Sequence, residues 1–175
     1  MNFCMRRFNT FLRLFVVLAL AAGCATGKKE DKLLAALRLH IESAANAPGN
    51  ATTVSVLRSE PMLVTITSEP VLTEANIVAA KLMETPGGFA VEVKFDEAGS
   101  LILEQFSSAN PGKHFALFGQ WGEKLKEGRW LAAPLINHRV ANGTLDFSPD
   151  TSREEAKLLV DGLNLAAKKN AGLTK

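Results

Sequence analysis

Apolar and polar residues alternate along much of this chain, and this pattern predicts β-strands. In residues 89–95, phenylalanine and valine occupy every second position from Phe89 on, as expected for a strand with one buried face. Shorter apolar runs that also favour strands occupy residues 37–42, 54–56, 62–66 and 77–83. Residues 114–118 are apolar on both faces, which indicates a strand inside a sheet.

Two short segments have the composition of hairpin turns. Thr85-Pro86-Gly87-Gly88 has proline and glycine where a type II turn needs them, and predicts a hairpin between residues 77–83 and 89–95. Asn142-Gly143 lies between the extended segments 131–140 and 145–147 and is a strong hairpin signal, so we expect these two segments to pair.

Helical periodicity appears twice. Apolar residues recur at helical spacing from Ala98 to Ala109, and Asn110-Pro111-Gly112 ends that helix. Near the C-terminus, Ser152 and Glu155 form a capping box. It precedes one apolar stripe, which consists of Ala156, Leu159, Val160, Leu163 and Ala167. These elements predict an α+β fold, an antiparallel sheet with two helices packed on one face.

The first residues carry a different pattern. Arg6, Arg7 and Arg13 precede an uninterrupted apolar run at 14–22, which Gly23-Cys24 follows. This is the arrangement of a secretory signal peptide, and the run is shorter than the roughly 20 residues of a membrane-spanning helix. The predicted organisation is a signal peptide at 1–23, a tether at 24–32 and a single α+β domain at 33–175.

The segment Leu20-Ala21-Ala22-Gly23-Cys24 resembles the lipobox of bacterial lipoproteins. The resemblance implies cleavage before Cys24 and attachment of fatty acids such as palmitate to its thiol, which anchors the protein to a membrane. Cys4 leaves with the signal peptide, so Cys24 has no disulfide partner. A plain secreted protein with a chance cysteine is the alternative. In lipoproteins of bacteria with two membranes, an aspartate directly after the acylated cysteine commonly signals retention in the inner membrane. Here that position is Ala25. The resemblance therefore implies that the protein lies on the periplasmic face of the outer membrane, if the organism has two membranes.

Charge argues against a nucleic-acid partner. The whole chain has a formal charge of +2, but cleavage removes three arginines and no acid, which leaves −1 on the mature protein. A basic surface of the kind that binds polyanions is therefore not expected.

No arrangement typical of catalysis or metal binding stands out. His40, His114 and His138 are placed singly, at none of the spacings typical of zinc ligands. The chain has no G-x-S-x-G or S-x-x-K motif. The acid pairs Asp96-Glu97 and Glu154-Glu155 fall at predicted helix starts, where carboxylates favour the helix dipole. We therefore expect neither an enzyme nor a cofactor or metal site.

A longer resemblance covers about residues 77–168. The order of elements in this region resembles that of the head subdomain of the first periplasmic domain of SecD, part of SecDF. That order is a strand, a helix, a turn, an apolar strand, an Ala-Pro-x-Ile-type segment, a glycine turn and a helix that opens with Glu-Ala. The matching segments are 91–95, 98–106, Asn110-Pro111-Gly112-Lys113, 115–118, Ala133-Pro134-Leu135-Ile136, Asn142-Gly143 and 155–164.

The SecD resemblance implies a non-catalytic module that binds or scaffolds another envelope or exported polypeptide. SecD itself carries membrane helices and works with SecF, whereas no stretch after the signal is long enough to span a membrane, so motor function is not implied. A small envelope hydrolase and a purely structural subunit of an envelope complex are the alternatives.

The segment 119–130 has the composition of a contact loop. Trp121 and Trp130 flank three cations, Lys124, Lys126 and Arg129, in a stretch that otherwise looks like a turn. Two interpretations remain open: the five side chains contact a partner, or the tryptophan rings fold back over the sheet as core.

Overall fold

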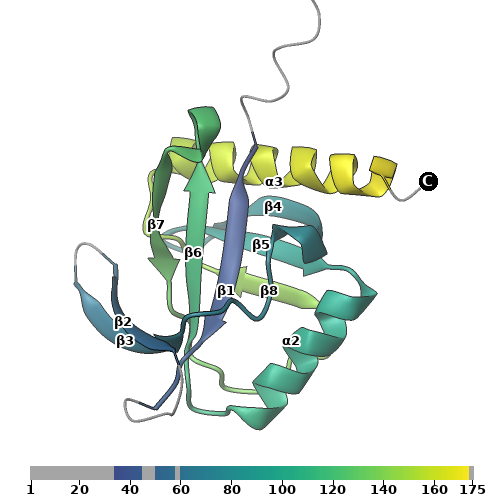
Figure 1. Ribbon diagram of the computed structural model, residues 1–175. Helices are drawn as coiled ribbons and strands as arrows, with labels where there is room; N and C mark the ends of the chain where they lie inside the picture. Colours follow the sequence, from purple (N-terminus) through teal and green to yellow (C-terminus); the bar gives the residue numbers. More distant parts are fainter. Residues whose placement is uncertain (1–33, 45–49, 58–59, 174–175) are drawn as a thin grey trace, which may run out of the picture. The chain divides into compact units, whose positions relative to one another are not determined.

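The computed structural model describes residues 34–44, 50–57 and 60–173 (Figure 1). The chain divides into two units, Met1–Glu30 and Asp31–Lys175, and only the second contains described residues. The predicted signal peptide, the tether and Cys24 therefore lie outside the described part.

Within the described residues, the strands pair only in antiparallel fashion and form three small sheets. The first sheet contains β1 (Ala36–Ile41), β6 (Phe115–Trp121) and β7 (Glu127–Ala132), in that order. The second sheet is the hairpin of β2 (Ala51–Val56) and β3 (Met62–Thr67). The third sheet contains β4 (Ile77–Thr85), β5 (Gly88–Phe95) and β8 (Thr144–Phe147), in that order. The helices are α2 (Glu97–Ala109) and α3 (Arg153–Leu173), with the short 3-10 turns η2 (Glu74–Asn76) and η3 (Glu123–Leu125).

One hydrophobic core lies between the two three-stranded sheets. Leu37 and Leu117 reach it from the β1-β6-β7 sheet, and Val91 and Val93 reach it from the β4-β5-β8 sheet. Both helices close the same core, α2 through Leu103 and α3 through its apolar stripe: Ala156, Leu159, Val160 and Leu163. The predicted α+β class with antiparallel strands and two helices is confirmed, although the strands form three sheets instead of one.

The strongest local patterns have the predicted structure. Gly87 has φ +88° in the turn between β4 and β5, a conformation that glycine adopts freely. Ser152 and Glu155 exchange the two hydrogen bonds of the capping box, at 2.9 and 3.2 Å. Asp96 caps α2 by accepting a hydrogen bond from the Gly99 N–H at 2.7 Å. The acid pairs thus include the N-cap of α2 and the capping glutamate of α3.

The predicted hairpin at Asn142-Gly143 is wrong. β7 ends at Ala132 and pairs with β6, whereas β8 pairs with β5. Gly143 has a positive φ of 67°, but Asn142 does not, so the pair lacks the geometry of a type I′ turn. Instead, the Asn142 side chain accepts a hydrogen bond from the Thr144 N–H at 3.1 Å and starts β8.

The expectation that residues 119–130 are turn-like is also wrong for most of that segment. β6 extends to Trp121 and β7 begins at Glu127, so a short turn around η3 is all that separates the two strands. Gly122, Lys124 and Leu125 have positive φ in this turn, which lets it reverse the chain within a few residues.

Candidate partner-binding surface

The two tryptophans lie on opposite faces of the β1-β6-β7 sheet. Trp121 ends β6 on the inner face and is only 1% exposed, so its ring belongs to the core. Trp130, in β7, is half-buried on the outer face. The sequence leaves two interpretations open, partner contact or a place in the core, and Trp121 lies in the core.

Arg129 lies with Trp121 on the inner face. Its guanidinium carbon is 4.9 Å from the centre of the Trp121 ring, a cation–π contact. The same guanidinium forms an ion pair with Glu155 at the start of α3. Arg129 therefore ties β7 to α3, and only part of its side chain faces solvent.

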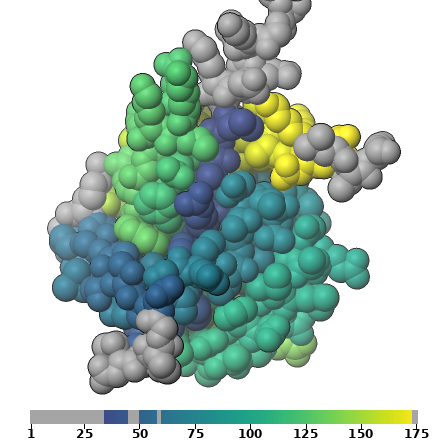
Figure 2. Space-filling view, in the orientation of Figure 1, coloured from purple at the N-terminus to yellow at the C-terminus, as the bar shows by residue number. Residues whose placement is uncertain are grey.

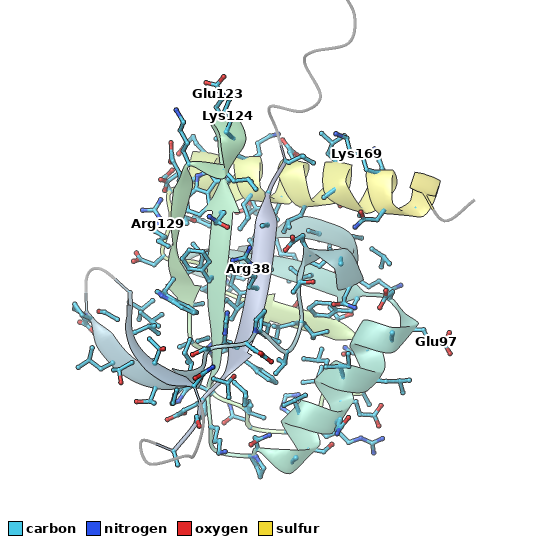
Figure 3. All side chains as sticks on the ribbon, viewed as in Figure 1. Arg38, Glu97, Glu123, Lys124, Arg129 and Lys169 are labelled. Carbon is cyan, nitrogen blue, oxygen red and sulfur yellow. The ribbon has the colours of Figure 1, made fainter. Side chains whose placement is uncertain are left out.

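Lys124 and Lys126 occupy the turn between β6 and β7. Both side chains are exposed, and Figure 3 shows Lys124 beside Glu123 at the tip of the turn, directed away from the sheet. Neither lysine forms an ion pair with another residue in the described ranges. The five predicted contact residues are thus divided among the core, the turn and the outer face.

The outer face of this sheet carries a shallow groove of about 320 Å³. The strand alternation brings three of its residues into one row, because Arg38 pairs with Phe118 and Phe118 pairs with Trp130. His40 follows on the same face of β1. The segment after β3 completes the lining, which consists of Arg38, His40, Ser68, Pro70, Phe118 and Trp130. In Figure 2, β1 forms a narrow band between β6–β7 and the blue-teal segment after β3.

Aromatic contacts fix the floor of this outer-face groove. The Trp130 ring lies 5.3 Å from the His40 ring at an interplanar angle of 69°, and 5.2 Å from the Phe118 ring at 59°. Gly128 leaves room beside them, since a Cβ there would lie 3.2 Å from the Phe118 ring. The groove therefore presents ring edges and faces at a fixed geometry.

Arg38 is the charged group of the groove. Burial lowers the pKa of His40, a hydrogen bond with the Thr67 carbonyl at 2.9 Å opposes that effect, and the charge of Arg38 lowers the pKa further. The lowered pKa favours the neutral imidazole. Arg38 is exposed, lies at the centre of the face seen in Figure 3, and forms no ion pair within the described part of the chain.

The remaining histidines and acids do not gather into a metal site in the described ranges. His114 binds Glu42 through its ring Nδ1, at 2.7 Å, and His138 is exposed on the loop before β8. Among residues 34–44, 50–57 and 60–173, no three histidine, cysteine or carboxylate side chains lie close enough to hold a metal ion. Nor is any helix of these residues long and apolar enough to cross a membrane.

Comparison with known proteins identifies the domain. The sequence pattern described as SecDF, P1 head subdomain, matches residues 51–167, well over half of the chain. The chain therefore belongs to the SecDF P1 head subdomain family.

Two solved structures support the fold. A structure of SecDF, described as a membrane component that enhances protein export, is 19% identical with a TM-score of 0.51 and covers 75% of this chain and 63% of that one. SecDF in its super-membrane-facing form is 19% identical with a TM-score of 0.53, over 77% of this chain and 19% of that one. This chain thus spans less than two thirds of either protein. A search of curated proteins finds no match.

Proposed function

We propose that this protein is a lipid-anchored, non-catalytic protein of the bacterial envelope whose P1 head domain binds another polypeptide. Family membership supports a domain of the kind found in an export-enhancing membrane component. The observation that carries the proposal is the outer-face groove, where Trp130 and Phe118 lie beside Arg38, a guanidinium with no ion pair to another described residue. Tryptophan and arginine are the residues most often responsible for binding energy in protein interfaces.

The partner in this proposal is an envelope or exported polypeptide in a non-native, extended form. A groove of about 320 Å³ has room for one or two side chains of such a segment. The rings supply apolar contact, and Arg38 supplies a site for a carboxylate. Lys124 and Lys126, at the end of the same sheet, add positive charge along the path of such a chain.

A binding measurement tests this function. The probe is a reduced, carboxymethylated secretory protein that remains unfolded, labelled with a fluorophore and titrated with the full chain in detergent. We expect Trp130→Ala and Arg38→Ala each to weaken binding about tenfold, since such anchors contribute more than 1 kcal/mol. Leu158→Ala serves as the control, because Leu158 is 42% exposed on α3 and does not line the groove. Equal affinities for all variants would reject the groove as the binding surface.

The lipid anchor is tested separately. Cys24→Ala should give a protein that incorporates no radiolabelled palmitate and stays unprocessed or soluble, because Cys24 is the only thiol left after cleavage of the signal peptide. Label retained by this variant would contradict the anchor without affecting the proposal for the groove.

A further inference from the structure

Two edge strands other than β8 each have an outward-facing residue whose main-chain groups have partners: Ala80 in β4 and Leu39 in β1. Beside β4, the side-chain amide of Asn164 accepts a hydrogen bond from the Ala80 N–H at 2.9 Å and donates one to the Ala80 carbonyl at 2.8 Å. Beside β1, Leu39 exchanges backbone hydrogen bonds with residues 71–72 at 2.8 and 2.9 Å. These contacts satisfy groups that would otherwise offer a template for another strand.

Most of the outward main-chain groups of β8 lack such a partner among the described residues. The Gly143 carbonyl accepts a hydrogen bond from the Phe95 N–H at 2.9 Å, so the alternation of an antiparallel pair turns Thr144 and Asp146 away from β5. Asn142 binds the Thr144 N–H. The Thr144 carbonyl and both main-chain groups of Asp146 have no backbone partner among the described residues.

A second groove, of about 470 Å³, runs beside this edge. One of its walls is β8, and the other is the segment 134–142, which is visible in Figure 1 as the loop below β8. Hydrogen bonds hold that wall in place, from the Phe115 N–H to the Pro134 carbonyl at 3.0 Å and from the Ile136 N–H to the Lys113 carbonyl at 2.8 Å. An extended segment bound along β8 would therefore lie between these two walls.

The charges on the outward face of the sheet indicate what such a strand should carry. Lys81, Glu92 and Asp146 lie directly opposite one another across β4, β5 and β8. Lys81 forms an ion pair with Glu92 at 2.8 Å, and this leaves Asp146 beside another carboxylate with no ion pair among the described residues. Burial raises the pKa of Asp146, and the charge of Glu92 raises it further against the opposing effect of Lys81. Arg139, on the far wall, is paired with Glu104.

We propose that the β8 edge binds an extended polypeptide segment as an added strand, with a lysine or arginine of that segment next to Asp146. The backbone groups of Thr144 and Asp146 would form the ladder, and the cation would continue the row of Lys81, Glu92 and Asp146. This inference rests on the proposed function and deepens it, because it names the conformation and charge of the bound segment. It concerns a surface separate from the outer-face groove.

The test uses two labelled seven-residue peptides of alternating threonine and valine, one with a central lysine and the other with a central glutamate. Titrated with the full chain in detergent, the lysine peptide should bind about fivefold more tightly than the glutamate peptide. Asp146→Lys should reverse this preference, whereas Glu60→Lys, an equal change of charge at an exposed site outside the second groove, should leave it unchanged. Equal binding of the two peptides, or an unchanged preference in Asp146→Lys, would overturn the proposal.

A second variant separates the backbone from the charge. Asp146→Pro removes the outward N–H but leaves the hydrogen bonds between β5 and β8, because position 146 does not donate to β5. It should lose binding of both peptides, whereas Asp146→Asn should keep binding and lose the preference. In the wild type, exchange of the Asp146 amide hydrogen should slow when the lysine peptide binds; unchanged exchange would also overturn the added strand.

The experiments can reject the β8 proposal and the proposed function separately. If the wild-type chain binds the unfolded protein probe and Trp130→Ala weakens that binding, but the lysine and glutamate peptides bind equally, the proposed function stands and the β8 edge is rejected. If wild-type chain binds neither the unfolded probe nor the peptides, the proposed function itself is rejected.

Discussion

Trp121 and Trp130 flank the same short turn but face opposite sides of one sheet, so the same residue type has two roles. Position along the strand decides this, because successive side chains of a strand point to opposite faces. The sequence identifies both rings as candidates for contact, and strand register assigns one to the core.

Substitution of each tryptophan should separate these roles. Trp121→Ala should lower the free energy of unfolding by about 3 to 5 kcal/mol, as is usual for a buried aromatic ring. Trp130→Ala should cost less, because its ring is only half-buried. Urea denaturation followed by circular dichroism measures both. Equal losses of stability would mean that Trp130 is as much a core residue as Trp121.

The pair of Glu42 and His114 should make stability depend on pH. Burial raises the pKa of Glu42, but this effect is outweighed. The ring and the N–H of His114 both donate hydrogen bonds to the Glu42 carboxylate, and the charges of His114 and Lys113 also favour its ionised form. The pKa of Glu42 therefore lies below its usual value. A carboxylate with a lowered pKa stabilises the fold above its unfolded-state pKa, and this contribution is lost as pH falls through the folded-state pKa.

Glu42→Gln should therefore be less stable than the wild type at pH 7, by about 1 kcal/mol for a pair that is partly exposed. The difference should vanish at a pH below the lowered pKa of Glu42, where the wild-type carboxyl is protonated as well. Urea denaturation at a series of pH values measures the difference. A gap that stays constant down to pH 2 would contradict the assignment.

At the scale of elements, sequence patterns predict those structures whose causes are local. The capping box and apolar stripe give α3, and the turn at residues 85–88 gives the hairpin of β4 and β5. The pairing of β8 with β5 depends on a partner far along the chain, so the local signal at Asn142-Gly143 was misleading. A turn dipeptide reports a bend, and tertiary context decides which strands it joins.

Asn164 shows how a helix protects a sheet edge. Its amide satisfies both main-chain groups of Ala80, so Asn164→Ala should cost about 1 to 3 kcal/mol by leaving them unpaired. The Ala80 amide should also exchange its hydrogen faster in this variant. Lys168→Ala, on an exposed part of the same helix, is the control and should change neither quantity. Unchanged exchange at Ala80 would mean that β4 does not need this cap.

At the scale of the molecule, the candidate surface was only partly predictable. Trp130 and the lysines of the turn lie close together in sequence, and their composition marks them. Arg38, His40 and Phe118 join them because β1 pairs with β6 across a long stretch of chain. The alternation of residues 37–42 does place Arg38 and His40 on one face, but nothing local indicates which strand lies beside them.

The β2–β3 hairpin has its own small hydrophobic cluster. Val56, Val64 and Ile66 pack on Ala116 of β6, separately from the main core. The opposite face of the hairpin is open, since Leu63 is 74% exposed. The segment after β3 contributes Ser68 and Pro70 to the outer-face groove, so the stability of the hairpin bears on the binding surface.

We therefore expect the hairpin to open more easily than the rest of the described chain. Native-state hydrogen exchange should give β2 and β3 amides lower opening free energies than the amides of β5 and β6, because local stability follows the apolar area that an element buries. Val64→Ala should lower protection mainly within the hairpin, whereas Val93→Ala, in the main core, should lower it throughout. If exchange in the hairpin instead tracks global unfolding in both variants, then the two clusters form one cooperative unit, and the groove is as rigid as the core.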